Sequence, residues 1–351
     1  MTLQSKNILV TGASGRLGQQ IIYELTKLGV KPVAQVRSGS NCTFLDSLGL
    51  EKRETDLRSR EALSGLTEGI DYVIHTAAIV NFRQDRFTQF AGVNTLAAVD
   101  LFNAAQENGV RRFLHISTVA AIGGVPRTKN SEHLKCDTAL ANEEFEFNLS
   151  ALRIPYIMTK HAAETELFKL SENSQMELVI VNPSIVIAPS RGMNDRAQAK
   201  KMLKRLVLPD LPNRLNLVDI RDCAKGIVAA LTKGRSGHRY ILGGDNITAR
   251  ELALAASTEV GLAPHLLRFP KSFYKVTSRL AVTFGVLMGK SKISYYPDLV
   301  RLLDYDWAFS SKKARDELGY KSRSIYTSLK DLLSDKFLDT YLKPIKNNNE
   351  H

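Results

Sequence analysis

Cysteine is scarce in this 351-residue sequence. Its three cysteines, Cys42, Cys136 and Cys223, lie far apart and form no Cys-x-x-Cys pair. The spacing therefore indicates neither a zinc site nor a disulfide framework, and we expect no bound metal. Sparse, unpaired cysteine fits a reducing compartment, so we expect a cytoplasmic protein.

Long apolar runs are also missing. The N-terminal residues contain no apolar core of signal-peptide length. The longest apolar run, 280–288, is far shorter than the roughly 20 residues that a transmembrane helix needs. A packed helix is the simplest interpretation of the helical spacing here, and a helix lying on a membrane surface is the alternative. The residues that set this spacing are Phe273, Val276, Leu280, Phe284 and Leu287.

The charge balance is basic, with a formal net charge of +12 and a pI of about 9.5. Such a balance favours anionic partners but does not specify a fold. Aromatic residues do not alternate with the basic ones, so we do not expect nucleic-acid binding. One local cluster is either a solvated helix face or a contact for a substrate phosphate or an anionic membrane surface. It consists of Arg196, Lys200, Lys201, Lys204 and Arg205.

Short apolar segments alternate with amphipathic ones through the first half of the chain. This alternation predicts an α/β fold, a Rossmann-type doubly wound parallel sheet with helices on both faces. Strands are predicted at 7–12, 31–37, 50–57, 71–78, 111–118 and 176–183. Helices are predicted at 17–28, 85–108 and 154–170.

The regular alternation of strands and helices ends after about residue 187. We predict a dinucleotide-binding domain over 1–187, to which a helix and a strand within 213–246 return. A smaller, mostly helical substrate lobe is predicted over 188–212 and 247–340. The polar tail 341–351 is predicted to be flexible.

The segment "TGASGRLG" places Gly12, Gly15 and Gly18 between the first strand and the first helix. Glycines there allow a tight turn and a close approach of the backbone to a pyrophosphate, which the helix N-terminus then binds. The strand–turn–helix context makes this a dinucleotide-binding prediction rather than a bare glycine pattern. Further cofactor contacts from the same turn are predicted for Ser14, Arg16 and Leu17.

No acidic residue follows the second strand, where NAD-binding proteins usually hold the ribose with Asp or Glu. Arg37 stands there instead, and a guanidinium suits a 2′-phosphate. We therefore expect NADP in preference to NAD, with NAD still possible. Asp56 and Leu57 follow the third strand, beside the expected adenine site. A helix N-cap is an equally open role for Asp56.

Six motifs occur in an order that resembles the extended short-chain dehydrogenases/reductases, the NAD-dependent epimerase/dehydratase family. They are "TGASGRLG", "HTAA", "VNT", "ISTVAAIG", "YIMTK" and "NPSIV". That family includes nucleotide-sugar epimerases, dihydroflavonol-reductase-like enzymes and 3β-hydroxysteroid dehydrogenases. The reductase-like branches are the most similar, because of "VRS" and "RYILGGDNIT".

The resemblance implies a catalytic group of Tyr156, Lys160 and Thr118. A tyrosine hydroxyl has a free pKa near 10, too high for proton transfer at neutral pH without help. A lysine one helical turn away lowers that pKa, and in the family it also holds the nicotinamide ribose. The second hydroxyl polarises the substrate oxygen. The adjacent Ser117 is expected to bond the backbone and to lie at the cofactor.

The resemblance also implies cofactor contacts at the other strand ends. Asn94 is expected to order the sheet end, although Leu96–Ala98 replaces a glycine–threonine pair that relatives commonly have. His75 is expected to be a buried structural histidine, and Asp222 to cap the helix that returns to the sheet. The remaining predicted contacts are Thr76, Ala77, Ala78, Asn182, Pro183 and Ile185.

For the substrate we expect walls at Asn81 and Phe82 and at the segments 126–147 and 188–205. The expected function is an NAD(P)-dependent oxidoreductase that interconverts a carbonyl and an alcohol by hydride transfer. The alternatives are a nucleotide-sugar epimerase or dehydratase with bound NAD, and a non-catalytic dinucleotide-sensing regulator. The resemblance further implies a possible homodimer through helices 85–108 and 154–170.

Overall fold

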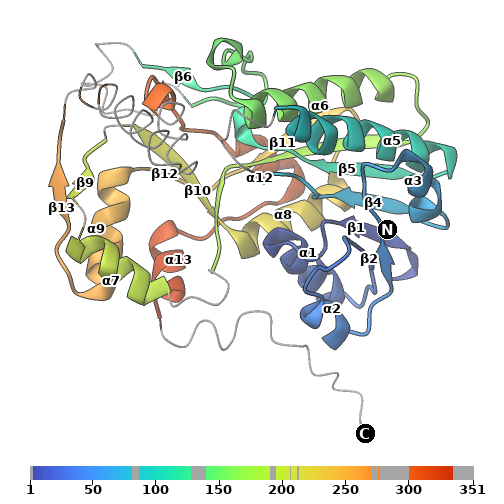
Figure 1. Ribbon diagram of the computed structural model, residues 1–351, viewed down its shortest axis with the longest axis horizontal. Coiled ribbons are helices and arrows are strands. Elements are labelled where there is room, and N and C mark those ends of the chain that lie inside the picture. Colours follow the sequence, from blue (N-terminus) through green and yellow to red (C-terminus); the bar gives the residue numbers. More distant parts are fainter. Residues whose placement is uncertain are drawn as a thin grey trace, which may run out of the picture.

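The computed structural model describes residues 3–80, 87–127, 140–189, 195–205, 207–211, 213–269, 273, 276 and 300–334. It confirms the predicted α/β fold (Figure 1). Seven strands form the main sheet in the order β11-β7-β5-β4-β1-β2-β3, and each pairing in it is parallel. Their bounds are β1 Ile8–Thr11, β2 Val33–Val36, β3 Lys52–Glu54, β4 Tyr72–His75, β5 Arg112–Ile116, β7 Glu177–Pro183 and β11 His238–Leu242.

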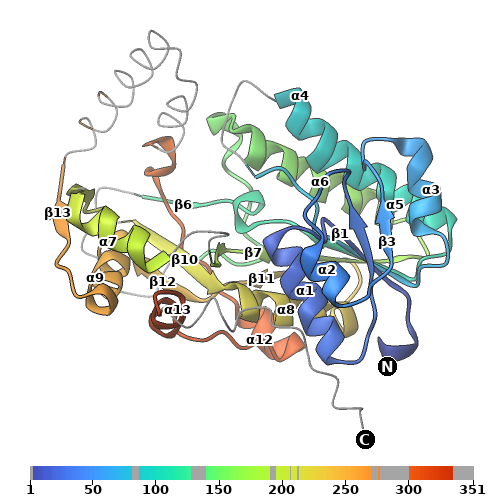
Figure 2. The same cartoon turned by 60° about the horizontal axis from the view of Figure 1, so that its bottom comes forward.

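Helices cover both faces of this sheet, as Figure 2 shows. On one face lie α1 (Arg16–Lys27), α2 (Thr43–Ser47), α8 (Ile220–Lys233) and α12 (Lys312–Leu318). On the other lie α3 (Arg60–Thr67), α5 (Ala97–Glu107) and α6 (Pro155–Ser171). Central strands are buried on both faces, which is why they read as continuous apolar runs.

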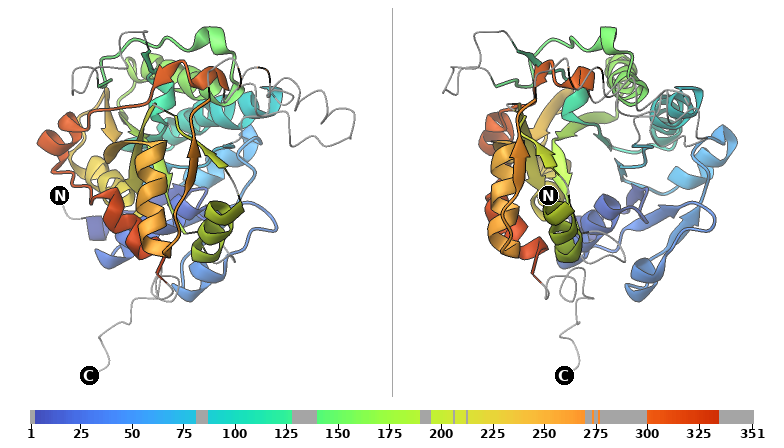
Figure 3. Two further views of the ribbon diagram at one scale, coloured as in Figure 1. Left: turned by 90° about the vertical axis from the view of Figure 1, so that its left-hand side faces the viewer. Right: turned by 60° about the vertical axis from the view of Figure 1, so that its left-hand side comes forward.

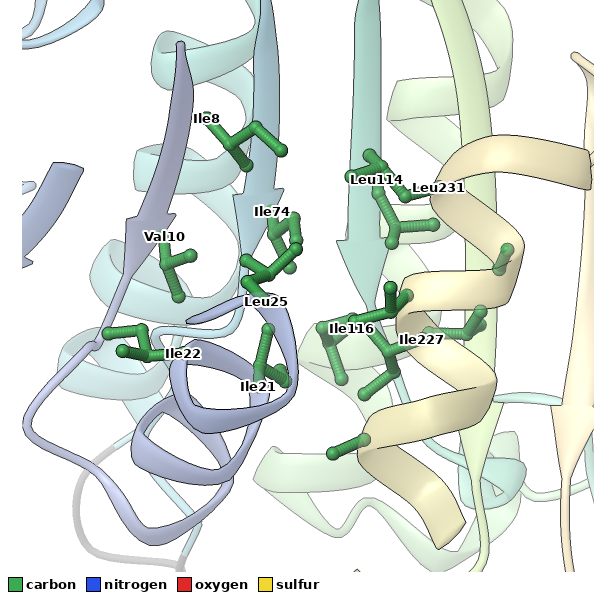
Figure 4. Close-up of a cluster of buried hydrophobic side chains, with 14 of the residues drawn as sticks. Ile8, Val10, Ile21, Ile22, Leu25, Ile74, Leu114, Ile116, Ile227 and Leu231 are labelled. Carbon is green, nitrogen blue, oxygen red and sulfur yellow. The ribbon is translucent and has the colours of Figure 1, made fainter. Parts of the chain in front are cut away.

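The core beneath α1 and α8 fixes the first strand–turn–helix unit to the sheet (Figure 4). Ile21, Ile22 and Leu25 of α1 are buried and point toward Ile8, Val10 and Ile74 of the strands in this close-up. Leu114 and Ile116 of β5 contact Ile227 and Leu231 of α8 in the same way. This packing places the N-terminus of α1 at the carboxyl edge of the sheet.

Two predicted elements differ in detail. The third strand is shorter than 50–57, because only Lys52–Glu54 pairs with β2 at the sheet edge. The predicted helix 85–108 is divided into α4 (Phe87–Phe90), a π-helical turn (Ala91–Leu96) and α5. A π-helical turn changes the direction of side chains along a helix, and here it brings Asn94 into the interior.

The C-terminal part is a mixed region with more strand than the sequence indicated. A second sheet has the order β12-β10-β8, and its helices are α9 (Ala249–Val260) and α13 (Ile325–Leu332). Nearby, α7 (Asp195–Arg205) packs on α9. The remaining strands are β6 Val125–Pro126, β8 Ile185–Ile187, β9 Val207–Pro209, β10 Arg214–Asp219, β12 Asp245–Thr248, β13 His265–Leu267 and β14 Tyr305–Asp306.

The segment 213–246, which was predicted to return to the main sheet, contributes elements to both sheets. Its helix α8 and strand β11 join the main sheet, as expected, whereas β10 pairs with β8 and β12. The chain passes from the main sheet to the second one at Ser184, between β7 and β8. Figure 3 (right) shows these C-terminal elements on one side and the first strands and helices on the other.

Candidate active site

A cavity of about 1360 Å³ lies at the carboxyl edge of the main sheet. Its wall combines the loops after β1, β2, β4, β5 and β7 with residues of β8, β10 and the segment 302–309. Parallel α/β sheets bind ligands at this edge. The volume exceeds the roughly 300–1,000 Å³ of an ordinary single-ligand pocket, so a dinucleotide and a second molecule have room together.

The glycine turn lines one end of this cavity. Gly12 has φ +62°, and a Cβ on it would lie 2.9 Å from the Cα of Ala77. A Cβ on Gly18 would lie 2.4 Å from the carbonyl oxygen of Gly12. These contacts show why a larger residue does not fit at either position. Helix α1 begins after Gly15 with no side-chain cap, so its first N–H groups face the cavity as an anion site.

Arg37, Asp56, Leu57 and Arg58 line the cavity beyond β2 and β3. Asp56 accepts hydrogen bonds from Nε and Nη2 of Arg58, and these bonds lower its pKa to about 2. The N-cap alternative for Asp56 is wrong, because α3 begins after Ser59. The Arg58 guanidinium thus neutralises the acid, while Arg37 is exposed at the end of β2.

Thr76, Ala77 and Ala78 follow β4 and line the cavity floor. The Oγ1 of Thr11 accepts hydrogen bonds from the backbone N–H groups of Thr76 and Ala77, which fixes this loop. His75 lies within the sheet, where its Nδ1 is 2.8 Å from the Thr11 Oγ1. Burial lowers the pKa of His75 to about 3, so the ring is neutral. Its position agrees with the expected structural role.

Asn94 is not among the residues that line the cavity, and its predicted cofactor contact stays a prediction. Its Oδ1 accepts from the Ile79 N–H at 2.8 Å, and its Nδ2 donates to the Ile79 carbonyl and to Thr159. The buried amide instead orders the chain after β4, as expected. In the segment 96–98, Leu96 is exposed while Ala97 and Ala98 are buried.

Two hydroxyls follow β5 at the cavity wall. Thr118 Oγ1 accepts from the Ala120 N–H at 3.3 Å, and its side chain is hydrogen-bonded to Tyr156. The expectation that Ser117 bonds the backbone is wrong for its side chain. Ser117 Oγ is buried at the cavity and has no hydrogen-bond partner among the described residues.

Tyr156 and Lys160 lie on one face of α6, one turn apart, and both line the cavity. Helix α6 begins with Pro155, where the missing N–H costs no helical hydrogen bond. Burial raises the pKa of the Tyr156 hydroxyl, and the hydrogen bond to Thr118 opposes this rise. Tyr156 and Lys160 are therefore a buried pair beside the Thr118 hydroxyl, and not a solvated pair on the surface.

Lys160 is 1% exposed, which is rare for an ammonium. Its Nζ donates to the Ile116 carbonyl at 2.6 Å and lies 3.1 Å from His115 Nε2. Burial lowers the pKa of Lys160 to about 8, and the carboxylate of Glu164 opposes this effect. An ammonium carries three N–H donors, so one remains for a ligand in the cavity.

Asn182 is fully buried and is not among the residues that line the cavity, and its predicted cofactor contact stays a prediction. Its Nδ2 donates to the Thr118 carbonyl at 3.0 Å and to Glu164 Oε1 at 2.6 Å. Glu164 also pairs with Arg239 of β11. Asn182 thereby connects the loop after β5 to α6. The neighbouring Pro183 and Ile185 do line the cavity.

A dinucleotide fits the residues at this edge. The close contacts of Gly12 and Gly18 leave the backbone bare where a pyrophosphate needs to approach. Ser117 Oγ and Ser184 Oγ are buried at the cavity without hydrogen-bond partners among the described residues. Unpaired buried hydroxyls are costly, and a polar ligand would satisfy them.

The far wall of the cavity was missed by sequence reasoning. It comes from residues beyond 200, which no motif marked. Asn213, Leu215, Leu302, Leu303, Trp307 and Phe309 line it. No local sequence pattern marks these side chains, because they come together only through the pairing of β10 and β14 with distant strands.

Several predicted substrate contacts lie outside the described residues, namely Asn81, Phe82 and 128–139. The flanking parts of the predicted 126–147 segment are packed, since Ala141 is buried and Phe147 stacks on His161 of α6 with centroids 3.7 Å apart. Asp222 does not cap α8. Asp219 does so, while Asp222 pairs with Arg323.

The basic cluster lies on α7, and none of its described side chains is among the residues that line the cavity. Lys200, Lys201 and Lys204 are exposed there. Within the described part of the chain, no helix has the length and apolar character to span a membrane. In the same residues, no group of three or more potential ligands could hold a metal ion.

Comparisons with known proteins point to one family. The model of the NAD-dependent epimerase/dehydratase family matches residues 8–243. A sterol demethylase protein B of Methylococcus capsulatus is 25% identical, over 93% of this chain and 97% of its own. A putative dihydroflavonol 4-reductase of Synechocystis is 29% identical over 92% of each chain. The solved structure of gox2253 has a TM-score of 0.78 and 25% identity, covering 96% of this chain and 99% of its own.

Proposed function

Because the chain belongs to the NAD-dependent epimerase/dehydratase family, whose members are NAD(P)-dependent oxidoreductases and epimerases, we propose that it is an NADP-linked carbonyl reductase. One observation carries the proposal. The hydroxyls of Tyr156 and Thr118 are hydrogen-bonded to each other at the cavity wall, one helical turn from the Lys160 ammonium. The Synechocystis relative is a putative dihydroflavonol 4-reductase, and a reductase agrees with this direction of reaction.

The two hydroxyls would converge on one carbonyl oxygen. Thr118 Oγ1 accepts from the Ala120 N–H, and its proton would turn from Tyr156 to the carbonyl oxygen when a substrate binds. Tyr156 would donate the proton that converts the developing alkoxide to an alcohol. Bound NADPH would supply the hydride. In the reverse reaction Tyr156 would accept the proton from the alcohol.

Lys160 would assist Tyr156 electrostatically. A positive charge close to a phenol favours the phenolate and lowers its pKa. This effect would add to that of the Thr118 hydrogen bond, which opposes the rise that burial causes in the pKa of Tyr156. The third N–H of Lys160 would hold a ribose hydroxyl of the cofactor. The Ile116 carbonyl fixes the ammonium in place, so little motion is needed for either task.

Three features support NADP. Arg37 lies at the end of β2 on the cavity wall, where a 2′-phosphate would need a cation. Asp56 is the only acidic side chain among the described lining residues, and Arg58 neutralises it. Gln35 is occupied, because its Oε1 accepts from the Gly12 N–H and its Nε2 donates to the Thr55 carbonyl. The one carboxylate among the described lining residues is therefore already engaged by an arginine.

The substitution Tyr156→Phe tests the proposal. It removes the proton donor and keeps the ring, so we expect kcat to fall about 10²- to 10⁴-fold, the usual contribution of a general acid. NADPH oxidation against a panel of aldehydes and ketones provides the measurement. NADPH affinity, followed by fluorescence titration, should stay close to that of the parent protein.

Tyr326→Phe is the matched control, because Tyr326 is half-exposed on α13 and does not line the cavity. It should keep the parental rate. A Tyr156→Phe protein as active as the parent would remove the proposed role. An epimerase would differ in another way, since it returns the hydride to the substrate and consumes no NADPH.

A further inference from the structure

The part of the cavity beyond Tyr156 has an apolar wall. Trp307 and Leu302 pack against the buried cluster that contains Tyr156 and Ile157. Beside Trp307, β10 contributes Leu215, which forms a β-bridge with it. The described apolar side chains of this half are Ile79, Val80, Val93, Val119, Ile157, Leu215, Leu302, Leu303, Trp307 and Phe309.

Polar groups in this half are already bonded to the protein. Trp307 Nε1 donates to the Leu302 carbonyl at 3.1 Å, so the indole presents only its carbon surface. Asn213 donates to the carbonyls of Leu303 and Tyr305 and accepts from Arg127. Gln89 is a further polar residue of the lining, and it is exposed. A ligand body here would meet hydrocarbon rather than unpaired donors.

The positively charged side chains of the cavity lining are distributed unevenly between its two halves. Arg16, Arg37 and Arg58 belong to the glycine turn and the loops after β2 and β3, where the dinucleotide would lie. Lys160 lies beneath Tyr156 and bonds the Ile116 carbonyl. These four are the only cations among the described lining residues. A nucleoside diphosphate in the other half would bring negative charges that lack a described cationic partner, and unpaired buried charge is strongly unfavourable.

We infer that the substrate is an uncharged, predominantly apolar carbonyl compound, and not a nucleotide sugar. Its hydrocarbon body lies against Trp307, Leu302 and Leu215, and its carbonyl oxygen meets Tyr156 and Thr118. The inference rests on the proposed function for the identity of the reacting group. The apolar wall supplies affinity through area removed from water, and the two hydroxyls supply orientation.

Trp307 makes the inference directly measurable, because the chain contains a single tryptophan. The intrinsic fluorescence of the protein therefore reports on this half of the cavity. We suggest titrating the NADP⁺-loaded protein with geranylacetone and with trans-1-decalone, which are neutral and do not absorb with tryptophan. UDP-glucose is the competing probe. We expect saturable binding of at least one ketone, with a Kd at least tenfold below that of UDP-glucose.

The variant Leu302→Asp places a carboxylate on the apolar wall. It should weaken ketone binding at least tenfold and leave NADPH affinity unchanged. Leu302→Asn is the milder second variant if the first does not fold. Leu254→Asp is the matched control, since Leu254 is 43% exposed on α9 and is not part of the lining. It should bind the ketone as the parent does.

Two results would overturn the inference. One is saturable binding of UDP-glucose at least as tight as that of both ketones. The other is no saturable change with either ketone up to its solubility limit. Because the titration needs no turnover, a ketone that binds without being reduced would count against the proposed function alone. Reduction of a charged substrate by NADPH would count against the apolar substrate alone.

Discussion

The two halves of the cavity are built in different ways. The dinucleotide half uses main chain, since its floor is the turn of Gly12 to Gly18 and the loop after β4. The opposite half uses bulky side chains, with Trp307 and Leu302 from the C-terminal part packed beside Tyr156. A backbone wall tolerates almost no substitution, whereas a side-chain wall can change shape with each replacement. The comparison suggests that cofactor binding is fixed and substrate choice is adjustable.

The largest effect in this comparison is expected at Gly18. Gly18→Ala would place a Cβ 2.4 Å from the Gly12 carbonyl oxygen and 3.0 Å from the Ala13 Cα. Both contacted atoms belong to the backbone, which cannot move aside as a flexible side chain can. Helix α1 would therefore have to shift away from the turn. Overpacking of this kind costs about 1–3 kcal/mol, which corresponds to roughly 5- to 150-fold weaker NADPH binding. Fluorescence titration with NADPH provides the measurement.

Gly65→Ala is the matched control, because Gly65 lies within α3 and a Cβ there would meet no atom within 4 Å. It should keep parental NADPH affinity and gain about 0.5–1 kcal/mol of stability from helix propensity. A Gly18→Ala protein that binds NADPH as tightly as the Gly65→Ala protein would contradict the importance of the close backbone contact.

An intermediate effect is expected at Arg37. Arg37→Gln would remove the cation proposed for the 2′-phosphate, and an exposed charge-assisted contact is worth about 1.5 kcal/mol. We expect the NADPH KM to rise about tenfold and the NADH KM to stay near its parental value. Steady-state kinetics with both cofactors would test this. Arg58→Gln is the matched control and should have a smaller effect, because the Arg58 guanidinium is paired with Asp56. Equal changes with NADH and NADPH would argue for NAD.

The smallest effect concerns Lys160, where the two halves meet. Burial lowers its pKa from the ordinary 10.5 to about 8. Between these values the unfolded chain binds more protons than the folded one, so folded-state stability should rise with pH. The gain from this group between pH 8 and 9 should be about 1 kcal/mol.

Denaturant unfolding at several pH values would reveal this gain as a difference between the parent protein and Lys160→Met. Relative to that variant, the parent should become more stable as the pH rises. Lys330→Met, at an exposed position on α13, serves as the control and should keep the parental pH dependence. A parent and a Lys160→Met protein with parallel pH profiles would show that the ammonium is not buried in solution.

Sequence patterns succeeded where neighbours in the chain are neighbours in space. The glycine turn joins β1 directly to α1, and Tyr156 and Lys160 share one helix, so local spacing was enough to place them. The strands of the main sheet were predicted because burial on both faces makes them apolar throughout. The edge strand β3 has exposed residues on both sides of its centre, and its bounds were predicted less well.

Local patterns leave the direction of a side chain open. Asn94 and Asn182 carry side chains that suit a cofactor, yet both amides are turned inward to bond the backbone and neighbouring side chains. A sequence motif gives the position of such a residue but not the direction of its side chain. Likewise Asp219, and not Asp222, caps α8, because Arg323 from the C-terminal part binds Asp222.

The sequence alone determined the alternation of strands and helices, the glycine turn and the tyrosine–lysine pair, since each is marked by residues a few positions apart. Only the tertiary structure decided which side chains face the cavity and what closes its far side. Trp307 comes to lie beside Tyr156 across about 150 residues of chain, through the pairing of β14 with β6 and the bridge to Leu215. Contacts at that separation depend on the packing of whole elements, which no local pattern of residues encodes.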